Sequence, residues 1–429
     1  MKTGKLSTMC RKLWDWENRD LAVLYFIDIV VSVLLITFWG VQYIGDSPSY
    51  ESAWRDSLSS WNIDIYRTPV YPLFIGLLQT VFGREYWSVA AICVQYLVFL
   101  FSIKYFYRLA TYITSSRIKV FVITMFYIFP FMTWCSITQT ESLAYSGSVL
   151  LIYYIRKLYV GGCSSADWIR YVLLLLFLIF LRPAFLYILP VLSVWWLLAA
   201  LDKRSYKMVL SGLGGVVIVL ASLFGYMRAY ENKYGVFAVS CVGTINQLYI
   251  ALENDLISPE TIQDNELRED IACVRQRISG KQSGIYSEVY GILDRHEMGV
   301  VHQMMADSYA NSLPKYLLSR FRNLYKSANE CLVVIWSGPL CLFTIYNLLG
   351  IKMGLLYLFV LICTVMTVRH VYKTGKVPMV WLLLYMLLAG NLIMVFVGAQ
   401  NEWNRLIVPS IPLFLLMACG FREFVGRPK

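Results

Sequence analysis

The sequence predicts an all-α polytopic membrane protein with about ten transmembrane helices. Of its 429 residues, 58% are hydrophobic and only 15% are charged, and the mean hydropathy is +0.57. A soluble chain of this size could not bury so much apolar surface in its core. Apolar runs near 20 residues long, such as 21–39 and 209–227, match the thickness of the hydrocarbon layer. They should be helices, because lipid leaves unpaired backbone groups unsatisfied.

The apolar runs predict ten spans, at 21–39, 87–105, 118–135, 140–155, 169–182, 184–201, 208–228, 343–368, 378–397 and 404–421. An even number of spans places both termini on the same side. The segments then assigned to that side hold 21 Lys and Arg against 6 Asp and Glu, whereas the two long segments opposite, 40–86 and 229–330, hold 13 against 18. This asymmetry follows the positive-inside rule, so we expect cytoplasmic termini and a multi-pass protein of a cell membrane.

The span pattern divides the chain into three parts. An N-terminal transmembrane module, 1–228, contains the first outer loop, 40–86, and a C-terminal transmembrane module covers 331–429. Between them lies an extracytoplasmic insert, 229–330. Its apolar residues recur at helical spacing, as at Ile271 and Val274, and turn signals follow at 279–280 and 311–314. The insert is therefore expected to be mainly helical.

Two further apolar stretches are expected on the outer surface. The run 69–82 is too short to cross the hydrocarbon layer, which favours an interfacial helix. The run 331–349 is apolar enough to cross, but a span there would place the cations of 369–376 outside. An interfacial or re-entrant segment agrees better with the charge pattern.

Several functional classes find no support in the sequence. The net charge is +11, yet no basic stripe with interleaved aromatic residues occurs, which argues against a nucleic-acid partner. The three histidines lack the spacing of metal ligands, and no Walker loop or dinucleotide fingerprint is present. No cofactor is predicted, and a divalent cation has no support.

Four charged residues stand at the outer ends of predicted spans, where they could meet both a lipid substrate and water: Asp46, Glu141, Arg182 and Arg405. Each also has a structural interpretation. Asp46 could cap the following helix, and Glu141 could favour a helix N-terminus. The two arginines could anchor their helices at the lipid head groups. A fifth candidate, Arg67, lies in a stiff segment between aromatic residues and prolines that can present its guanidinium to a phosphate.

The first outer loop resembles a known family. Its segments Asp46-Ser-Pro-Ser-Tyr50 and Tyr66-Arg67-Thr-Pro-Val-Tyr71-Pro are similar to the Asp…Tyr…Arg-x-Pro-x-Tyr-Pro pattern of the polytopic glycosyltransferases of the C-type fold. Protein mannosyltransferases and the lipid A aminoarabinose transferase belong to this family, which takes a sugar from a polyprenyl-phosphate carrier outside the cytoplasm. Thr140-Glu141, Leu181-Arg182-Pro183 and Arg405 with its following prolines resemble other family elements more weakly.

The resemblance implies a role for each candidate. Asp46 would be the catalytic base, and Glu141 a second acid that assists acceptor or sugar binding. The substrate-binding residues would be Tyr50, Tyr66, Arg67, Tyr71, Arg182, Glu402 and Arg405. The partners would be a polyprenyl-phosphate-linked sugar donor, a glycan or glycolipid acceptor and the lipid bilayer, which in this family points to a bacterial inner membrane.

Two departures from the family pattern narrow the expectation. Many relatives carry two adjacent acids in the first loop, whereas Asp46 is followed by Ser47, so help from a metal or a second acid loses support. The His-Pro-Pro pattern of protein mannosyltransferases is missing from the prolyl segment. An envelope glycan or glycolipid is therefore favoured over a protein acceptor.

Alternatives from other classes stay open. An envelope polysaccharide polymerase or ligase would place its decisive residues in the late loop. A glycolipid transporter or flippase would have paired broken helices near the membrane midplane, and the sequence has no symmetric pair of this kind. A receptor or scaffold would leave the pattern of Asp46 and Arg67 without a reason.

Overall fold

The computed structural model describes residues 3–43, 45–132, 134, 136–161, 164–332, 349–375, 378–399 and 403–425. Every named element in these ranges is a helix. Extended backbone is paired there at two isolated bridges, a parallel one between Gln42 and Ile137 and an antiparallel one between Cys331 and Lys352. The predicted all-α class is confirmed for the described part of the chain.

Seven helices in the described ranges are long and apolar enough to cross a membrane: Trp16–Phe38, Val70–Ile113, Pro183–Lys203, Tyr206–Tyr234, Met353–Thr374, Met379–Gly398 and Trp403–Phe424. The remaining three predicted spans are helices as well, namely α4 (Arg117–Met132), α5 (Thr140–Val160) and α6 (Ser165–Leu181). Most residues of α5 are buried, since this helix packs between α3 and α6 in the centre of the bundle. A helical membrane protein is confirmed, and the total of ten spans stays a prediction.

Helix α1 (Thr3–Trp39) begins well before the predicted span, and a short helix α2 (Ser47–Asp56) follows it. Helix α3 (Val70–Ile113) contains both the predicted interfacial run 69–82 and the predicted span 87–105. The two parts are separated at Gly83, whose φ of 76° lies in the left-handed region that glycine adopts without strain. The segment before Gly83 packs against α2, where the indole of Trp54 leaves no room for a Cβ at Gly76.

The second half of the membrane bundle is formed by α7 (Ile188–Lys203), α8 (Tyr206–Tyr234), α15 (Met353–Thr374) and α16 (Met379–Gly398). The predicted span 343–368 is wrong at its start, because α15 begins only at Met353, after Gly350 with a φ of 65°. The predicted interfacial or re-entrant segment 331–349 lies almost entirely outside the described residues.

The last span is a composite of three short elements rather than one regular helix. It consists of α17 (Trp403–Ile407), the 3₁₀ turn η4 (Val408–Ser410) and α18 (Ile411–Val425). Pro409 and Pro412 lack the backbone N–H that a regular helix requires, which explains the interruption. α17 and η4 are largely buried, and η4 packs against α5.

Residues 229–330 are mainly helical, and their place outside the cytoplasm stays a prediction. This insert comprises α9 (Val242–Glu253), α10 (Asn265–Ser279), α11 (Ile285–Arg295), α12 (Met298–Asn311) and α13 (Leu313–Ala328). Ile271 and Val274 are fully buried in a hydrophobic cluster separate from that of the membrane bundle. α10 ends immediately before Gly280, and Pro314 lies in the first turn of α13, so both predicted turn signals coincide with helix ends.

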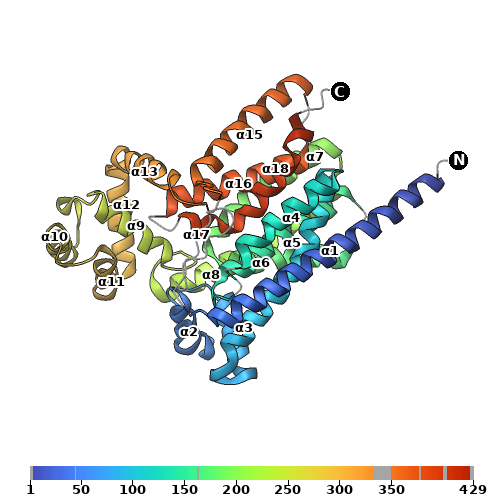
Figure 1. Cartoon of the computed structure of the whole chain (residues 1–429). Coiled ribbons are helices and arrows are strands. Elements are labelled where there is room, and N and C mark those ends of the chain that lie inside the picture. The colour runs from blue at the N-terminus through green and yellow to red at the C-terminus, as the bar shows by residue number, and fades with distance from the viewer. Residues whose placement is uncertain are drawn as a thin grey trace.

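Figure 1 shows how these parts are arranged. The insert helices α10, α11 and α12 lie at one end of the bundle, and α2 lies near the same end. α1 begins and α18 ends away from the insert. The two long segments 40–86 and 229–330 therefore share one end of the molecule.

Candidate functional site

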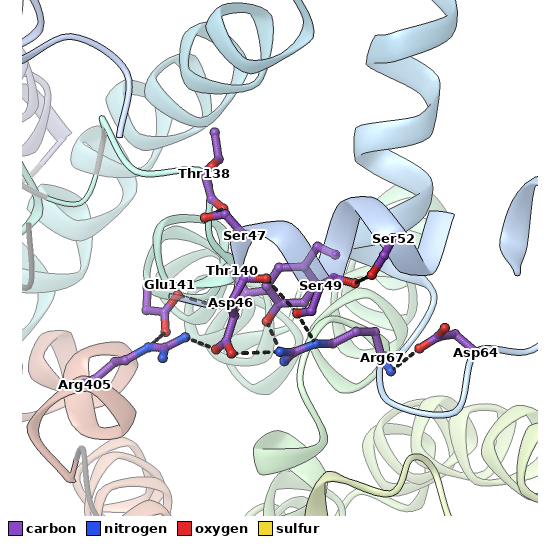
Figure 2. A network of polar contacts seen from close by, with 11 residues as sticks. Asp46, Ser47, Ser49, Ser52, Asp64, Arg67, Thr138, Thr140, Glu141 and Arg405 are labelled. Atoms are coloured by element: carbon purple, nitrogen blue, oxygen red, sulfur yellow. Dashed lines mark hydrogen bonds and ion pairs between the residues drawn. The ribbon is translucent and has the colours of Figure 1, made fainter. Parts of the chain in front are cut away.

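Asp46 lies in the turn between α1 and α2, at the position that precedes the first residue of α2. Its side chain makes no capping hydrogen bond to that helix. Instead, Oδ1 accepts a hydrogen bond from Nη2 of Arg67 at 2.7 Å, and Oδ2 accepts one from Nη2 of Arg405 at 2.5 Å. Figure 2 shows the carboxylate between the two guanidinium groups. The carboxylate is thus committed to ion pairs rather than to capping.

The prolyl loop presents Arg67 from a fixed backbone. The Asp64 carboxylate accepts hydrogen bonds from the backbone N–H groups of Tyr66 and Arg67, at 2.9 and 2.7 Å. An aspartate that bonds the backbone two residues ahead stabilises a turn. The Arg67 guanidinium also donates from Nε to the Ser49 hydroxyl at 2.8 Å and lies over the Tyr50 ring, 4.5 Å from its centre. Arg67 is therefore held on three sides.

Glu141 lies in the first turn of α5 and is fully buried. Its Oε1 accepts a hydrogen bond from Nε of Arg405 at 2.5 Å, and Nη1 of Arg182 lies 3.3 Å from the same oxygen. Arg405, which comes from α17, therefore joins Glu141 to Asp46. A buried carboxylate is costly unless it is paired, and here two cations surround it.

Arg182 lies between α6 and the turn that leads to α7. The following Pro183 restricts it to the extended conformation, with φ of −148° and ψ of 126°. The side chain is only 10% exposed. Although Nη1 forms an ion pair with Glu141, it makes no hydrogen bond within the described part of the chain. This N–H group is buried beside the Glu141 carboxylate.

The three predicted tyrosines have different surroundings. Tyr71 is fully buried and donates its hydroxyl to Gln95 Oε1 at 2.8 Å, and the Gln95 amide in turn donates to the carbonyl of Ile137. Tyr50 is buried edge-on against Tyr71, with ring centres 4.8 Å apart. Tyr66 is half-buried and meets Tyr290 of the insert, 6.1 Å between ring centres. Contact with a substrate is thus open to Tyr66, whereas Tyr71 supports the loop from beneath.

Access to the cluster is concentrated at one residue. The Asp46 side chain is 33% exposed, whereas those of Arg67, Arg405 and Glu141 are 17%, 9% and 0% exposed. Of the two acids, Asp46 is therefore the accessible one. The cluster holds three arginines and two carboxylates, and three positive minus two negative charges leave one positive charge.

The two arginines determine the ionisation of Asp46. Burial alone would raise its pKa, but the charges and hydrogen bonds of Arg67 and Arg405 outweigh burial and lower the pKa to about 2. A carboxylate with this pKa is ionised throughout the neutral range. It is also a weak base as long as both arginines hold it.

The structure brings together Asp46, Glu141, Arg67, Arg182 and Arg405, all of them predicted candidates. Glu402 lies outside the described residues. Sequence reasoning missed Asp64 and Tyr290. Asp64 could have been found from the sequence. An aspartate often accepts hydrogen bonds from the backbone N–H groups two or three residues after it, and this arrangement forms a turn. Tyr290 carries no such signal, since only tertiary packing brings it near Tyr66. Within the described ranges, no three His, Cys, Asp or Glu side chains gather as metal ligands would.

A scan against protein-family models and a search of curated proteins found no match to this chain. The resemblance to the C-type glycosyltransferases therefore depends on the residues quoted from the sequence.

Glu141→Gln should destabilise the protein more than Asp46→Asn. Without the negative charge of Glu141, the buried positive charges of Arg182 and Arg405 are less well neutralised. Breaking a buried ion pair lowers the free energy of unfolding by on the order of 3 kcal/mol. The partly exposed Asp46 pair should cost about 1 kcal/mol. Thermal unfolding in a fixed detergent would measure the order, with the exposed Glu260→Gln as the matched control. A larger loss for Asp46→Asn than for Glu141→Gln would contradict this assignment.

Proposed function

We propose that this chain is a membrane glycosyltransferase that moves a sugar from a polyprenyl-phosphate donor to an envelope glycan or glycolipid acceptor on the extracytoplasmic side. The observation that carries the proposal is the cluster at Asp46. One accessible carboxylate and three arginines from distant parts of the chain converge there. General-base and phosphate-binding groups are the two requirements of this transfer.

The charge of the cluster suits a phosphate diester. A polyprenyl-phosphate sugar carries one negative charge, which matches the single excess positive charge of the cluster. Arginine offers paired donors to phosphate oxygens and keeps its charge near lipid. Arg182 has an N–H group, at Nη1, without a hydrogen bond to a described residue. Arg67 and Arg405 can exchange their hydrogen bonds with the Asp46 oxygens for hydrogen bonds with phosphate oxygens.

In the proposed reaction, an acceptor hydroxyl oxygen forms a bond to the anomeric carbon while the bond from that carbon to the phosphate oxygen breaks. The bonding electrons leave with the polyprenyl phosphate, whose charge the arginines stabilise. The hydroxyl proton passes to the Asp46 carboxylate and then to water. The sugar ring has oxocarbenium character at the transition state, so a nearby carboxylate also stabilises it electrostatically.

Binding of the polyprenyl-phosphate sugar would make Asp46 a stronger base. In the structure, both oxygens of Asp46 are bonded to arginines. A phosphate that takes over these arginine donors leaves the carboxylate free and raises its pKa. Asp46 would then accept the acceptor proton only when a donor is present, which limits wasteful activation of water.

Glu141 acts in this proposal as a positioning residue rather than as a second catalytic acid. It is fully buried, and it pairs with Arg405 and Arg182. Its charge therefore orients the two arginines instead of reaching a substrate. Tyr66, beside the insert, is placed to contact the sugar or the acceptor.

The position of the cluster favours a transferase over its rivals. A transporter site is expected near the middle of the membrane helices, whereas Asp46 follows the end of the first apolar span at Phe38. A polymerase or ligase would concentrate its decisive residues in a late loop. Here the accessible acid and Arg67 both belong to the first loop.

Asp46→Asn should abolish sugar transfer. The amide keeps the size of the side chain but is a far weaker base, so the rate should fall by about 10²- to 10⁴-fold. Turnover of a panel of polyprenyl-phosphate sugars by the purified protein in lipid would measure it. Asp56→Asn, at the exposed end of the same helix α2, is the control and should keep full activity. Full activity of Asp46→Asn would show that another group is the base.

Arg67→Ala should impair donor use more than acceptor use, because Arg67 is assigned to the phosphate. Loss of its charge-assisted hydrogen bonds should raise the donor KM by about tenfold or more. The exposed Arg322→Ala on α13 serves as the control. An unchanged donor KM together with a raised acceptor KM would reverse the assignment.

The pH dependence of the reaction should show that the donor frees Asp46. With Arg67 and Arg405 bonded to it, Asp46 has a pKa of about 2, so kcat/KM for the sugar donor should lose no activity through Asp46 until the pH approaches that value. In the donor complex the pKa should be higher, because phosphate competes for the arginines. The acid limb of kcat should therefore lie at higher pH than that of kcat/KM. Coincident limbs would argue against release of Asp46 by the donor.

A further inference from the structure

A second polar pocket lies between α2, the short turn η1 (Leu58–Ser60) and α3. Its volume is about 230 Å³. It shares no residue with the Asp46 cluster. The residues that line it are Glu51, Trp54, Arg55, Ser59, Gln79 and Arg84.

The pocket contains a carboxylate that neutral groups hold. Glu51 accepts a hydrogen bond from the Tyr43 hydroxyl at 2.5 Å and another from the Gln79 amide at 3.1 Å. Neither donor carries a charge, and within the described part of the chain no cation lies at ion-pair distance from Glu51. Burial, and after it the bond to Glu51, raises the pKa of the Tyr43 hydroxyl. The negative charge of Glu51 therefore faces the pocket, where the charge of Arg55 acts on it only from beyond ion-pair distance.

The two arginines of the same pocket, Arg55 and Arg84, also lack a strong ion-pair partner among the described residues. Arg84 is exposed and makes no hydrogen bond or ion pair with other described residues. Arg55 forms an ion pair with its neighbour Asp56, and both side chains are more than half exposed. Such an exposed pair is weak and exchanges readily for a better partner. The pocket thus offers one carboxylate and two guanidinium groups to a ligand that carries both charges.

The surroundings of the pocket indicate that the ligand is part of a lipid. The segment 70–82 exposes Leu73, Leu77 and Val81, which recur every four residues and form one apolar face. Beyond the bend, Tyr86 is 64% exposed. A helix that exposes an apolar face beside polar side chains can lie in the membrane interface with that face in the acyl chains. Gln79 and Arg84 would then lie at the depth of the lipid head groups.

We propose that this pocket binds the head group of a zwitterionic phospholipid with a primary ammonium, that is, phosphatidylethanolamine. The ammonium donates hydrogen bonds to Glu51, and the phosphate accepts them from Arg84 and Arg55. The Trp54 ring borders the same space. The lipid would fix the bend of α3 against α2, the helix that begins beside Asp46.

Other head groups satisfy fewer of these side chains. Phosphatidylglycerol has no cation for Glu51 and places its negative charge near that carboxylate. Phosphatidylcholine has a cation, but its quaternary nitrogen has no N–H to donate. A comparison of the binding of the three lipids therefore distinguishes the contribution of Glu51 from that of the arginines.

The test is lipid retention, measured by native mass spectrometry on the purified full-length protein with equal amounts of the three lipids and identical acyl chains. Phosphatidylethanolamine should be retained about tenfold over the other two, the factor that corresponds to one charge-assisted hydrogen bond. Glu51→Gln should remove its advantage over phosphatidylcholine. Arg84→Gln should lower the retention of all three lipids by about threefold to tenfold.

Two exposed positions provide matched controls, since Glu260→Gln and Arg322→Gln should leave the lipid preference unchanged. Equal or stronger retention of phosphatidylglycerol by the unmutated protein would overturn the proposal, as would a preference that survives Glu51→Gln. Because Glu51 also holds Tyr43 and Gln79, its variant could unfold. Arg84 makes no described contact, so Arg84→Gln then decides alone, and unchanged retention would overturn the proposal.

The source of the head group is tested separately. Soluble glycerophosphoethanolamine carries the same ammonium and phosphate without acyl chains. It should displace bound phosphatidylethanolamine only at far higher concentration, because the apolar face of 70–82 contributes nothing to its binding. Displacement at equal concentration would show that the pocket recognises a free zwitterion and would overturn the lipid assignment.

Discussion

The candidate site depends on the Arg405 guanidinium, which joins the last helical span to the first loop and to α5. Arg405 comes from the last helical span, yet its partners are Asp46, just after the first span, and Glu141, at the start of α5. The Arg405 side chain is 9% exposed. A buried cation is costly unless carboxylates neutralise it, so these two acids must be present where α17 meets α5. A packing that separates the last span from the first loop would break the pair between Arg405 and Asp46, and the buried Arg405 would then keep Glu141 alone.

The insert contributes to the same site by holding the prolyl loop. Ile63, Ile65 and Tyr66 pack against the hydrophobic cluster of the insert. The backbone carbonyl of Ile65 accepts hydrogen bonds from the N–H of Cys241 and from the Tyr230 hydroxyl. Because Arg67 follows two residues later, a displacement of the insert would move its guanidinium. A ligand bound to the insert can thus act on the charge cluster without touching Asp46.

Sequence reasoning predicted the elements better than their contacts. The helices follow from the long apolar runs, and the separate runs 69–82 and 87–105 lie on the two sides of the bend at Gly83. The five charged members of the cluster could also be named, because four stand at the outer ends of predicted spans and Arg67 lies in a stiff segment between prolines and aromatic residues. Their pairing could not be predicted, since Asp46 and Arg405 are 359 residues apart and only tertiary packing joins them. For the same reason the burial of Tyr71, whose hydroxyl is taken by Gln95, was not foreseen.

Asp46 and Glu141 differ in exposure and therefore in how easily each can give up its arginine partners. Two carboxylates that share one arginine would compete for it if their surroundings were equal. Glu141, fully buried between Arg182 and Arg405, cannot give up its partners without leaving a charge in a medium of low dielectric constant. Asp46, one third exposed, can exchange its arginines for water or for a proton donor at much lower cost. An incoming anion would therefore displace Asp46 rather than Glu141, and the arginines would remain oriented while the accessible carboxylate becomes free.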